Sequence, residues 1–147
     1  MVCTFFGHRD CPSSVSPILC KTILELIEKH NVDTFYVGNS GSFDLIVKSV
    51  LRKISLQHPH IRFYVVLAYI PQNNISDSWD DYSETIVPEG IEFSPKRFAI
   101  SWRNRWILKQ SDYVVTYITR NYGGAVTAYS SAIKQGKTVI NLADHQT

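Results

Sequence analysis

The stretch FAISWRNRWILKQSDYVVTYITRNYGG, from Phe98 to Gly124, places a charged helix, an apolar strand and a glycine turn in immediate succession. Residues 112–118 form a nearly continuous apolar run, which is typical of a parallel strand buried on both faces. Glycines between a strand and a helix let backbone N–H groups approach an anion at the positive end of the helix dipole. The stretch therefore predicts a strand, turn and helix of an α/β sheet, with an anion site at Gly123 and Gly124. An ordinary tight turn explains the glycine pair equally well.

The helix expected over Ala99–Gln110 carries polar side chains on its apolar side. Spacings of three and four residues put Arg103 in one stripe with Trp106 and Ile107, and they put Asn104 on a face with Ile107 as well. Arg103 and Asn104 therefore either lie at the rim of a cleft or pair with buried carboxylates. A guanidinium in a cleft suits a phosphate or carboxylate, because its donor fork binds two oxygens at once.

Two earlier loops also suit an anion. The first follows a short apolar strand over residues 2–6 and reads Gly7-His8-Arg9. It is either a phosphate loop or a polar loop that caps the next helix. Both interpretations remain open from the sequence.

The second loop, residues 38–44, follows a strand over residues 33–37 and leads into a helix. Its backbone amides and the Ser40 and Ser42 hydroxyls suit an anion or a ribose. Asp44 either accepts a hydrogen bond from a ligand or sits favourably in the first helical turn, and its spacing favours the helix role.

Apolar strands alternate with amphipathic helices along the whole chain. The expected strands cover residues 2–6, 33–37, 61–68, 112–118 and 137–142. Helices between parallel strands predict an α/β fold: a single Rossmann-like domain over residues 1–147, with a doubly wound parallel sheet of about five strands in the order 3-2-1-4-5 and helices on both faces. The loops after strands one, two and four then emerge at the carboxyl edge of the sheet. Residues 69–97 are acidic and rich in turn formers, which indicates a long loop or lid.

Composition narrows the class of protein. Hydrophobic residues make up 44% and charged residues 19% of the 147 residues, which fits a folded globule. A net charge of +2 argues against nucleic acid as a partner, and the longest apolar run, residues 63–70, is too short to span a membrane. The three cysteines lack metal-ligand spacing, and no leader is visible, so we expect a reduced, cytoplasmic setting without a metal or cofactor.

Several motifs, taken in order, resemble one family. They are residues 5–9 (FFGHR), 38–44, 88–92 and 97–100, then Arg103-Asn104, Ser111-Asp112 and Gly123-Gly124. In this order they resemble the YpsA-like branch of the SLOG superfamily over nearly the whole chain. The resemblance implies a Rossmann-like domain that binds nucleotides or nucleotide-derived ligands, with contacts from Gly7, Arg9, Gly38, Ser40, Gly41, Asp44, Gly123 and Gly124.

One departure from related sequences bears on catalysis. Cytokinin-activating enzymes related to this superfamily carry Pro-Gly-Gly-x-Gly-Thr-x-x-Glu, and the glutamate serves hydrolysis of a nucleoside monophosphate. This chain keeps Gly123, Gly124 and Thr127, but it has Val126 in place of a glycine and Ser130 in place of the glutamate. A serine cannot do that carboxylate's acid–base work at neutral pH.

The sequence thus favours a non-enzymatic sensor or sequestering protein for a nucleotide-derived molecule, such as an ADP-ribose-like compound or a cyclic nucleotide. His8, Arg103, Asn104 and Thr127 complete the predicted ligand contacts. The alternative is an N-glycoside or phosphoribosyl hydrolase that uses Asp44 or Glu89. We also expect a homo-oligomer through the helix face that bears Trp102, because exposed aromatic side chains often mark contacts between subunits.

Overall fold

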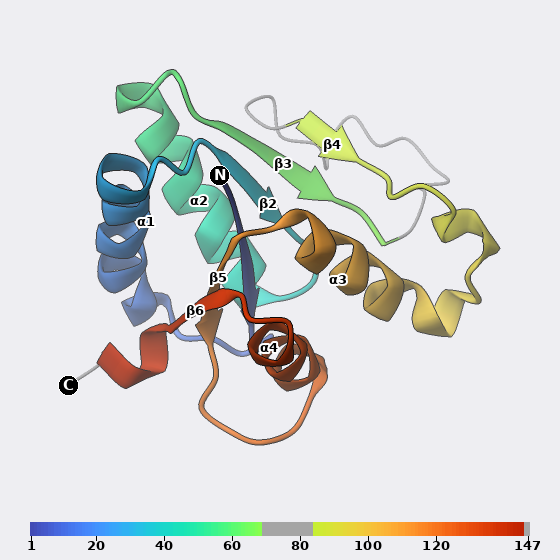
Figure 1. Ribbon diagram of the computed structural model, residues 1–147. Coiled ribbons are helices and arrows are strands. Elements are labelled where there is room, and N and C mark those ends of the chain that lie inside the picture. The colour runs from blue at the N-terminus through green and yellow to red at the C-terminus, as the bar shows by residue number, and fades with distance from the viewer. Residues whose placement is uncertain (69–83, 146–147) are drawn as a thin grey trace.

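The computed structural model describes residues 1–68 and 84–145, and its strands form one parallel sheet (Figure 1). The six strands lie in the order β4-β3-β2-β1-β5-β6. All neighbouring pairs are parallel, and β1 lies between β2 and β5. The strands are β1 (Val2–Gly7), β2 (Thr34–Val37), β3 (Arg62–Val66), β4 (Glu84–Ile86), β5 (Tyr113–Tyr117) and β6 (Thr138–Asn141). The predicted α/β class and the order of the predicted strands are confirmed, with β4 as an additional edge strand.

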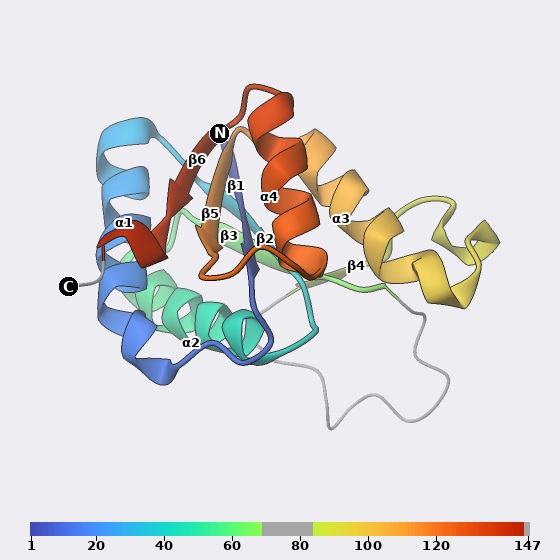
Figure 2. The same ribbon diagram turned by 90° about the horizontal axis from the view of Figure 1, so that it is seen from below.

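Four helices cover the sheet. They are α1 (Ser16–His30), α2 (Ser42–Gln57), α3 (Ala99–Gln110) and α4 (Gly124–Lys134), and short 3₁₀ turns lie at Ser13–Val15, Ile91–Phe93, Lys96–Phe98 and Leu142–His145. Figures 1 and 2 show α1 and α2 on one side of the sheet and α3 and α4 on the other. The sheet is therefore doubly wound, as the alternation of strands and helices predicts.

The core consists of two layers, one on each face of the sheet. Phe5 of β1 packs with α1 and α2 in one layer, whereas the next residue, Phe6, packs with α3 and α4 in the other. Both phenylalanines are less than a tenth exposed. Consecutive side chains of a strand point to opposite faces, so a strand covered on both sides needs apolar residues at successive positions.

The segment before α3 differs from the sequence-based expectation in one respect. The prediction of a long loop or lid covered residues 69–97, of which residues 69–83 lie outside the described residues. Within the described part, Glu84–Ile86 forms β4 beside β3, and two 3₁₀ turns precede α3. A three-residue strand is too short to show an alternating pattern, which is why the sequence did not predict it. A lid over the site stays a prediction.

The winding direction changes at β1. The chain leaves β1 toward β2 and later returns to pair with the opposite side of β1 through β5. Open α/β sheets bind ligands beyond the carboxyl ends of their strands at such a switch point. The longest described helix, α2, has 16 residues, and none of the described helices is long and apolar enough to cross a membrane.

Candidate functional site

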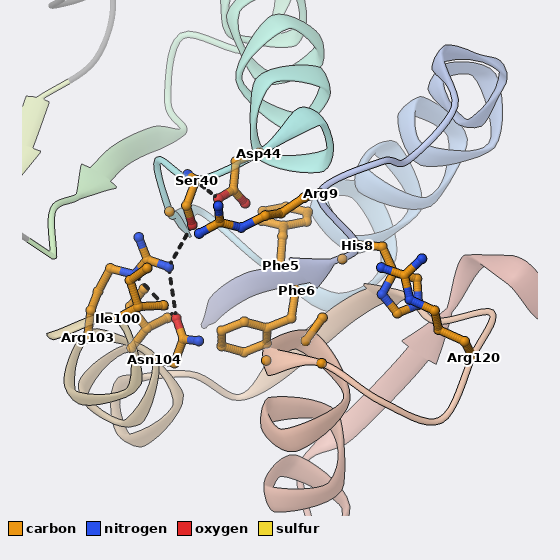
Figure 3. A pocket seen from close by; sticks show the side chains of 16 residues that line it. Phe5, Phe6, His8, Arg9, Ser40, Asp44, Ile100, Arg103, Asn104 and Arg120 are labelled. Atoms are coloured by element: carbon orange, nitrogen blue, oxygen red, sulfur yellow. Dashed lines mark hydrogen bonds between the residues drawn. The ribbon is translucent and has the colours of Figure 1, made fainter. Parts of the chain in front are cut away.

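A pocket of about 350 Å³ lies at the carboxyl edge of the sheet (Figure 3). Its walls come from the loops after β1, β2 and β5 and from the inner side of α3, and its size is within the range of small-molecule sites. The lining residues are Phe5, Phe6, Gly7, His8, Arg9, Gly38, Ser40, Asp44, Ile100, Arg103, Asn104, Ile107, Arg120, Gly123, Gly124 and Ala125. The three loops that the sequence singled out therefore converge on one cavity.

The pocket brings together every predicted contact except Gly41 and Thr127. Gly41 is the N-cap of α2, where its φ of 116° and its packing on Arg9 make it part of the loop's framework. Thr127 is exposed on α4, and its hydroxyl lies 3.4 Å from the Gly123 carbonyl oxygen, which accepts its hydrogen bond. Both residues support neighbouring backbone and lie outside the pocket lining.

A buried carboxylate and a buried guanidinium meet at the wall formed by β2, α2 and α3. Asp44 and Arg103 are 8% and 4% exposed. The backbone N–H of Ser40 donates to Asp44 Oδ2 at 2.9 Å, and Arg103 Nη2 donates to Ser40 Oγ at 3.2 Å. Gly38 lies between them, since a Cβ there would be 2.9 Å from Asp44 Oδ2 and 3.0 Å from Arg103 Cζ. Arg103 thus lines the cleft, and its charge lies near a buried carboxylate.

The environment of Asp44 shifts its protonation equilibrium. Burial raises the pKa of the Asp44 carboxyl, and the Ser40 backbone N–H, the Arg103 and Lys48 charges and the Ser40 hydroxyl oppose this rise. Asp44 is also in the first turn of α2, where its charge interacts favourably with the helix dipole. The helix-start role that the sequence favours and a place in the pocket lining therefore coincide in one residue.

A second polar group lies at the opposite end of the pocket, around His8. The backbone N–H of Thr119 donates to His8 Nε2 at 3.1 Å, so the ring proton of the neutral form is on Nδ1. Burial lowers the pKa of His8, the nearby Arg120 charge lowers it further, and Asp10 partly opposes both effects. Arg120 Nη1 pairs with Asp10 Oδ2 at 3.1 Å, and the guanidinium lies 4.9 Å from the centre of the Tyr122 ring.

The N-terminus of α4 is open toward the pocket. Gly123, Gly124 and Ala125 line the cavity, and no side chain caps the helix at Gly123. A Cβ added at Gly123 or Gly124 would meet nothing within 4 Å. Uncapped N–H groups at a helix N-terminus are suited to bind an anion. The anion site that the glycine pair predicts is therefore geometrically available.

Sequence reasoning missed Arg120 and the apolar part of the lining. Arg120 follows β5 by three positions, so a cation just beyond a strand's carboxyl end was the available signal. The apolar lining residues are Phe5, Phe6, Ile100, Ile107 and Ala125. Their side chains count as core in any sequence pattern, and only the fold reveals that they border a cavity.

The remaining predictions concern residues outside the pocket lining. Glu89 is exposed and does not line the pocket, so a hydrolase of the predicted kind depends on Asp44. Trp102 is half-buried, and its ring would be 3.3 Å from a Cβ at Gly90. Its face is thus partly covered by the same chain, and an oligomer through it stays a prediction. The described residues contain no cluster of three or more His, Cys, Asp or Glu side chains that could hold a metal.

Comparisons with known proteins bear on the fold. No protein-family model and no curated protein sequence matches the chain. The chain is similar to the X-ray structure of DNA processing protein A (DprA) from Streptococcus pneumoniae, with a TM-score of 0.66 and 18% sequence identity. The alignment covers 93% of this chain and 48% of that chain, so this chain spans about half the length of the matched protein. At this level of identity the likeness shows the fold, and it supports the Rossmann-like α/β architecture described above.

Proposed function

We propose that this protein, as a member of the YpsA-like branch, binds a nucleotide or nucleotide-derived small molecule at the carboxyl edge of its sheet and acts as a sensor or sequestering protein. The observation that carries the proposal is the open N-terminus of α4, which shares one pocket with Arg9, Arg103 and Arg120. A phosphate group suits uncapped helix N–H groups beside guanidinium side chains.

Arg9 is the cation best suited to a phosphate. Its side chain is exposed and extends over the pocket toward Ser40 (Figure 3). Among the described residues its guanidinium has no hydrogen-bond or ion-pair partner, whereas Arg120 is already paired with Asp10. A guanidinium that is not yet engaged can bind a ligand without first breaking an internal contact.

The apolar lining suits the rest of a nucleotide. Phe6, Ile100 and Ala125 border the cavity between β1, α3 and α4. Small-molecule sites combine such walls with a few polar groups that fix the ligand's orientation. A base and ribose against this wall, with a phosphate at α4, match the chemistry of the pocket.

The small number of carboxylates at the described pocket favours binding without hydrolysis. Ser130, which stands in place of the related enzymes' glutamate, is exposed and outside the pocket lining. Asp44 is the sole carboxylate among the described lining residues. Because Asp44 lines the pocket, N-glycoside hydrolysis through this carboxyl is the second candidate function. Turnover of AMP or ADP-ribose by the parent protein, lost in Asp44→Asn, would establish that alternative.

The test combines ligand release and calorimetry. The purified protein is denatured and the released small molecules are identified by mass spectrometry, and titrations then measure binding of AMP, GMP, ADP-ribose and cyclic nucleotides. We expect binding in the micromolar range and an affinity loss of about 10-fold or more in Arg9→Gln, since a charge-assisted hydrogen bond is removed. Arg105→Gln is the control, because Arg105 is exposed on α3 and outside the pocket lining. Absence of any nucleotide binding would refute the proposal.

A further inference from the structure

Arg103 determines which atom of Asn104 can reach a ligand. Arg103 Nε and Nη2 both donate to Asn104 Oδ1, at 3.2 Å and 3.1 Å. A guanidinium has donors and no acceptor, so only the oxygen of the carboxamide can face it. The oxygen and nitrogen of Asn104 are therefore assigned by chemistry, which is the proper basis for orienting an amide.

Arg103 also donates toward Ser40, next to Asp44. Ser40 Oγ accepts from Arg103 Nη2, and the Ser40 backbone N–H and hydroxyl interact with the Asp44 carboxylate. These hydrogen bonds therefore form a series that runs from Arg103 through Ser40 and ends at the Asp44 carboxylate. Ser40 and the engaged Arg103 nitrogens are occupied within the protein.

The amide nitrogen of Asn104 is the exception. Among the described residues nothing accepts a hydrogen bond from Asn104 Nδ2, and Asn104 lines the pocket. Figure 3 shows this nitrogen on the side of Asn104 that faces Phe6. Asn104 consequently offers two amide hydrogens to the cavity while its oxygen is engaged by Arg103.

This arrangement restricts the kind of base that Asn104 can recognise. A free asparagine contacts adenine through both ends of its amide, accepting from the amino group and donating to a ring nitrogen. Asn104 cannot do so without giving up its two contacts from Arg103. It remains a donor, next to the apolar wall of Phe6 and Ile100 that suits a flat ring.

We propose that Asn104 selects the ligand's base by donating from Nδ2 to an exocyclic oxygen, so that nucleotides with oxo bases bind more tightly than their amino counterparts. This inference rests on the proposed function, and it names the class of ligand for that site. Hypoxanthine and uracil carry the oxygen at the position where adenine and cytosine carry an amino group. An amino group at that position would place donor against donor.

The test is calorimetric titration of IMP against AMP and of UMP against CMP. We expect the oxo member of each pair to bind about fivefold to tenfold more tightly, as one neutral hydrogen bond gained and one mismatch avoided would give. In Asn104→Asp the preference should disappear or reverse, because a carboxylate still accepts from Arg103 but cannot donate to the base.

Asn39→Asp is the matched control. Asn39 Oδ1 accepts from Lys48 Nζ at 3.2 Å, so this exposed residue undergoes the same change of charge beside a cation, but it lies outside the pocket lining. It should keep the oxo preference, and thermal melts should show both variants folded. Binding with no oxo preference, or a preference unchanged in Asn104→Asp, overturns this inference alone. No binding of any of these four nucleotides by the parent protein also overturns this inference, and the proposed function fails with it if ADP-ribose and the cyclic nucleotides do not bind either.

Discussion

The pocket is bordered by two glycine-capped helices whose first turns look alike but have different surroundings. Gly41 begins α2 with φ and ψ of 116° and 179°, and Gly123 begins α4 with 107° and 170°. Both conformations belong to a region that is essentially restricted to glycine. The backbone conformation at the start of the two helices is therefore the same, and only their surroundings differ.

The loop before α2 is filled by the protein itself. Gly41 packs on the Cα of Arg9, and the backbone N–H and hydroxyl of Ser42 both donate to the Arg9 carbonyl oxygen. The Ser40 N–H is taken by Asp44. The Ser40 and Ser42 donors of this loop therefore already have partners within the protein.

The loop before α4 is held at its start and open at its end. Thr119 donates to His8 and Arg120 pairs with Asp10, which ties the beginning of the loop to the β1 loop. Gly123 and Gly124 have open space around them. The comparison teaches that a glycine turn leaves room for a ligand only where the protein itself does not occupy the space beside the glycine.

The largest expected effect comes from exchanging the two cap glycines for alanine. Gly123→Ala should lower the free energy of unfolding by about 1–3 kcal/mol through backbone strain alone. Gly41→Ala should lower the free energy of unfolding through the same strain and by about 1–3 kcal/mol more through overpacking, since the new Cβ would lie 2.8 Å from Arg9 Cα. Urea denaturation of both variants measures the difference.

Equal losses of stability in the two variants would contradict this contrast. They would mean that the loop before α2 shifts to admit a methyl group and is not a rigid wall. Gly136→Ala is a useful reference, because Gly136 has a φ of 73° and a Cβ there would meet nothing within 4 Å.

A smaller effect on stability is expected when the pH is lowered, because the hydrogen bond from the Thr119 N–H to His8 joins the β5 loop to the β1 loop. The folded-state pKa of His8 lies below the ordinary value of 6.5, so the unfolded chain binds the proton more readily. The contribution of neutral His8 is fully present above pH 6.5 and is lost as the pH falls through the folded-state pKa. Urea midpoints between pH 7.5 and 5 should therefore fall more in the parent protein than in His8→Gln.

Glutamine is the appropriate replacement because its amide oxygen can accept from the Thr119 N–H without titrating. Asp44 acts in the opposite direction, since its raised pKa gives a contribution that is lost as the pH rises through it. It is common to both proteins and cancels in their difference. Parallel pH profiles for the parent and His8→Gln would show that His8 is not held neutral.

The smallest effect on stability is expected at Gly124, together with a clear effect on binding. Gly124 has no positive φ and no neighbour that an added Cβ would touch. Alanine in the first turn of α4 should leave stability unchanged or raise it by about 0.4–1 kcal/mol. Nucleotide affinity should nevertheless fall, because the methyl group would occupy space beside the helix N–H groups. A stable Gly124→Ala variant with unchanged affinity would place the ligand elsewhere in the pocket.

Much of the fold and part of the candidate site follow from the sequence. Apolar runs separated by amphipathic helices identify the strands, and right-handed crossovers then fix their order. The loops at Gly7, Gly38 and Gly123 are predictable because the carboxyl ends of parallel strands meet at one edge. Arg103 is predictable as a site residue because a charged side chain in the apolar stripe of a helix needs a partner or a cleft.

Other features depend on three-dimensional contacts that the sequence alone does not specify. Glu84–Ile86 becomes a strand because the exposed edge of β3 offers backbone partners. Gly41 and Gly123 have the same conformation, and only the folded structure shows that Arg9 occupies the space beside Gly41. Arg120 was not predicted as a site residue because a basic residue in a loop is normally solvated, whereas here it lies beside His8.

The central position of β1 has a consequence for the order in which the molecule is assembled. β1 (Val2–Gly7) pairs on one side with β2 (Thr34–Val37), but its partner on the other side, β5 (Tyr113–Tyr117), is more than one hundred residues further along. At ribosomal rates of about 5–20 residues per second, that separation corresponds to about 5–20 s of synthesis. Throughout this interval the backbone N–H and C=O groups on one edge of β1, a strand rich in apolar side chains, lack their partners in β5. Slow, non-local pairing of this kind makes the nascent chain, more than the finished protein, the form that is most exposed to aggregation.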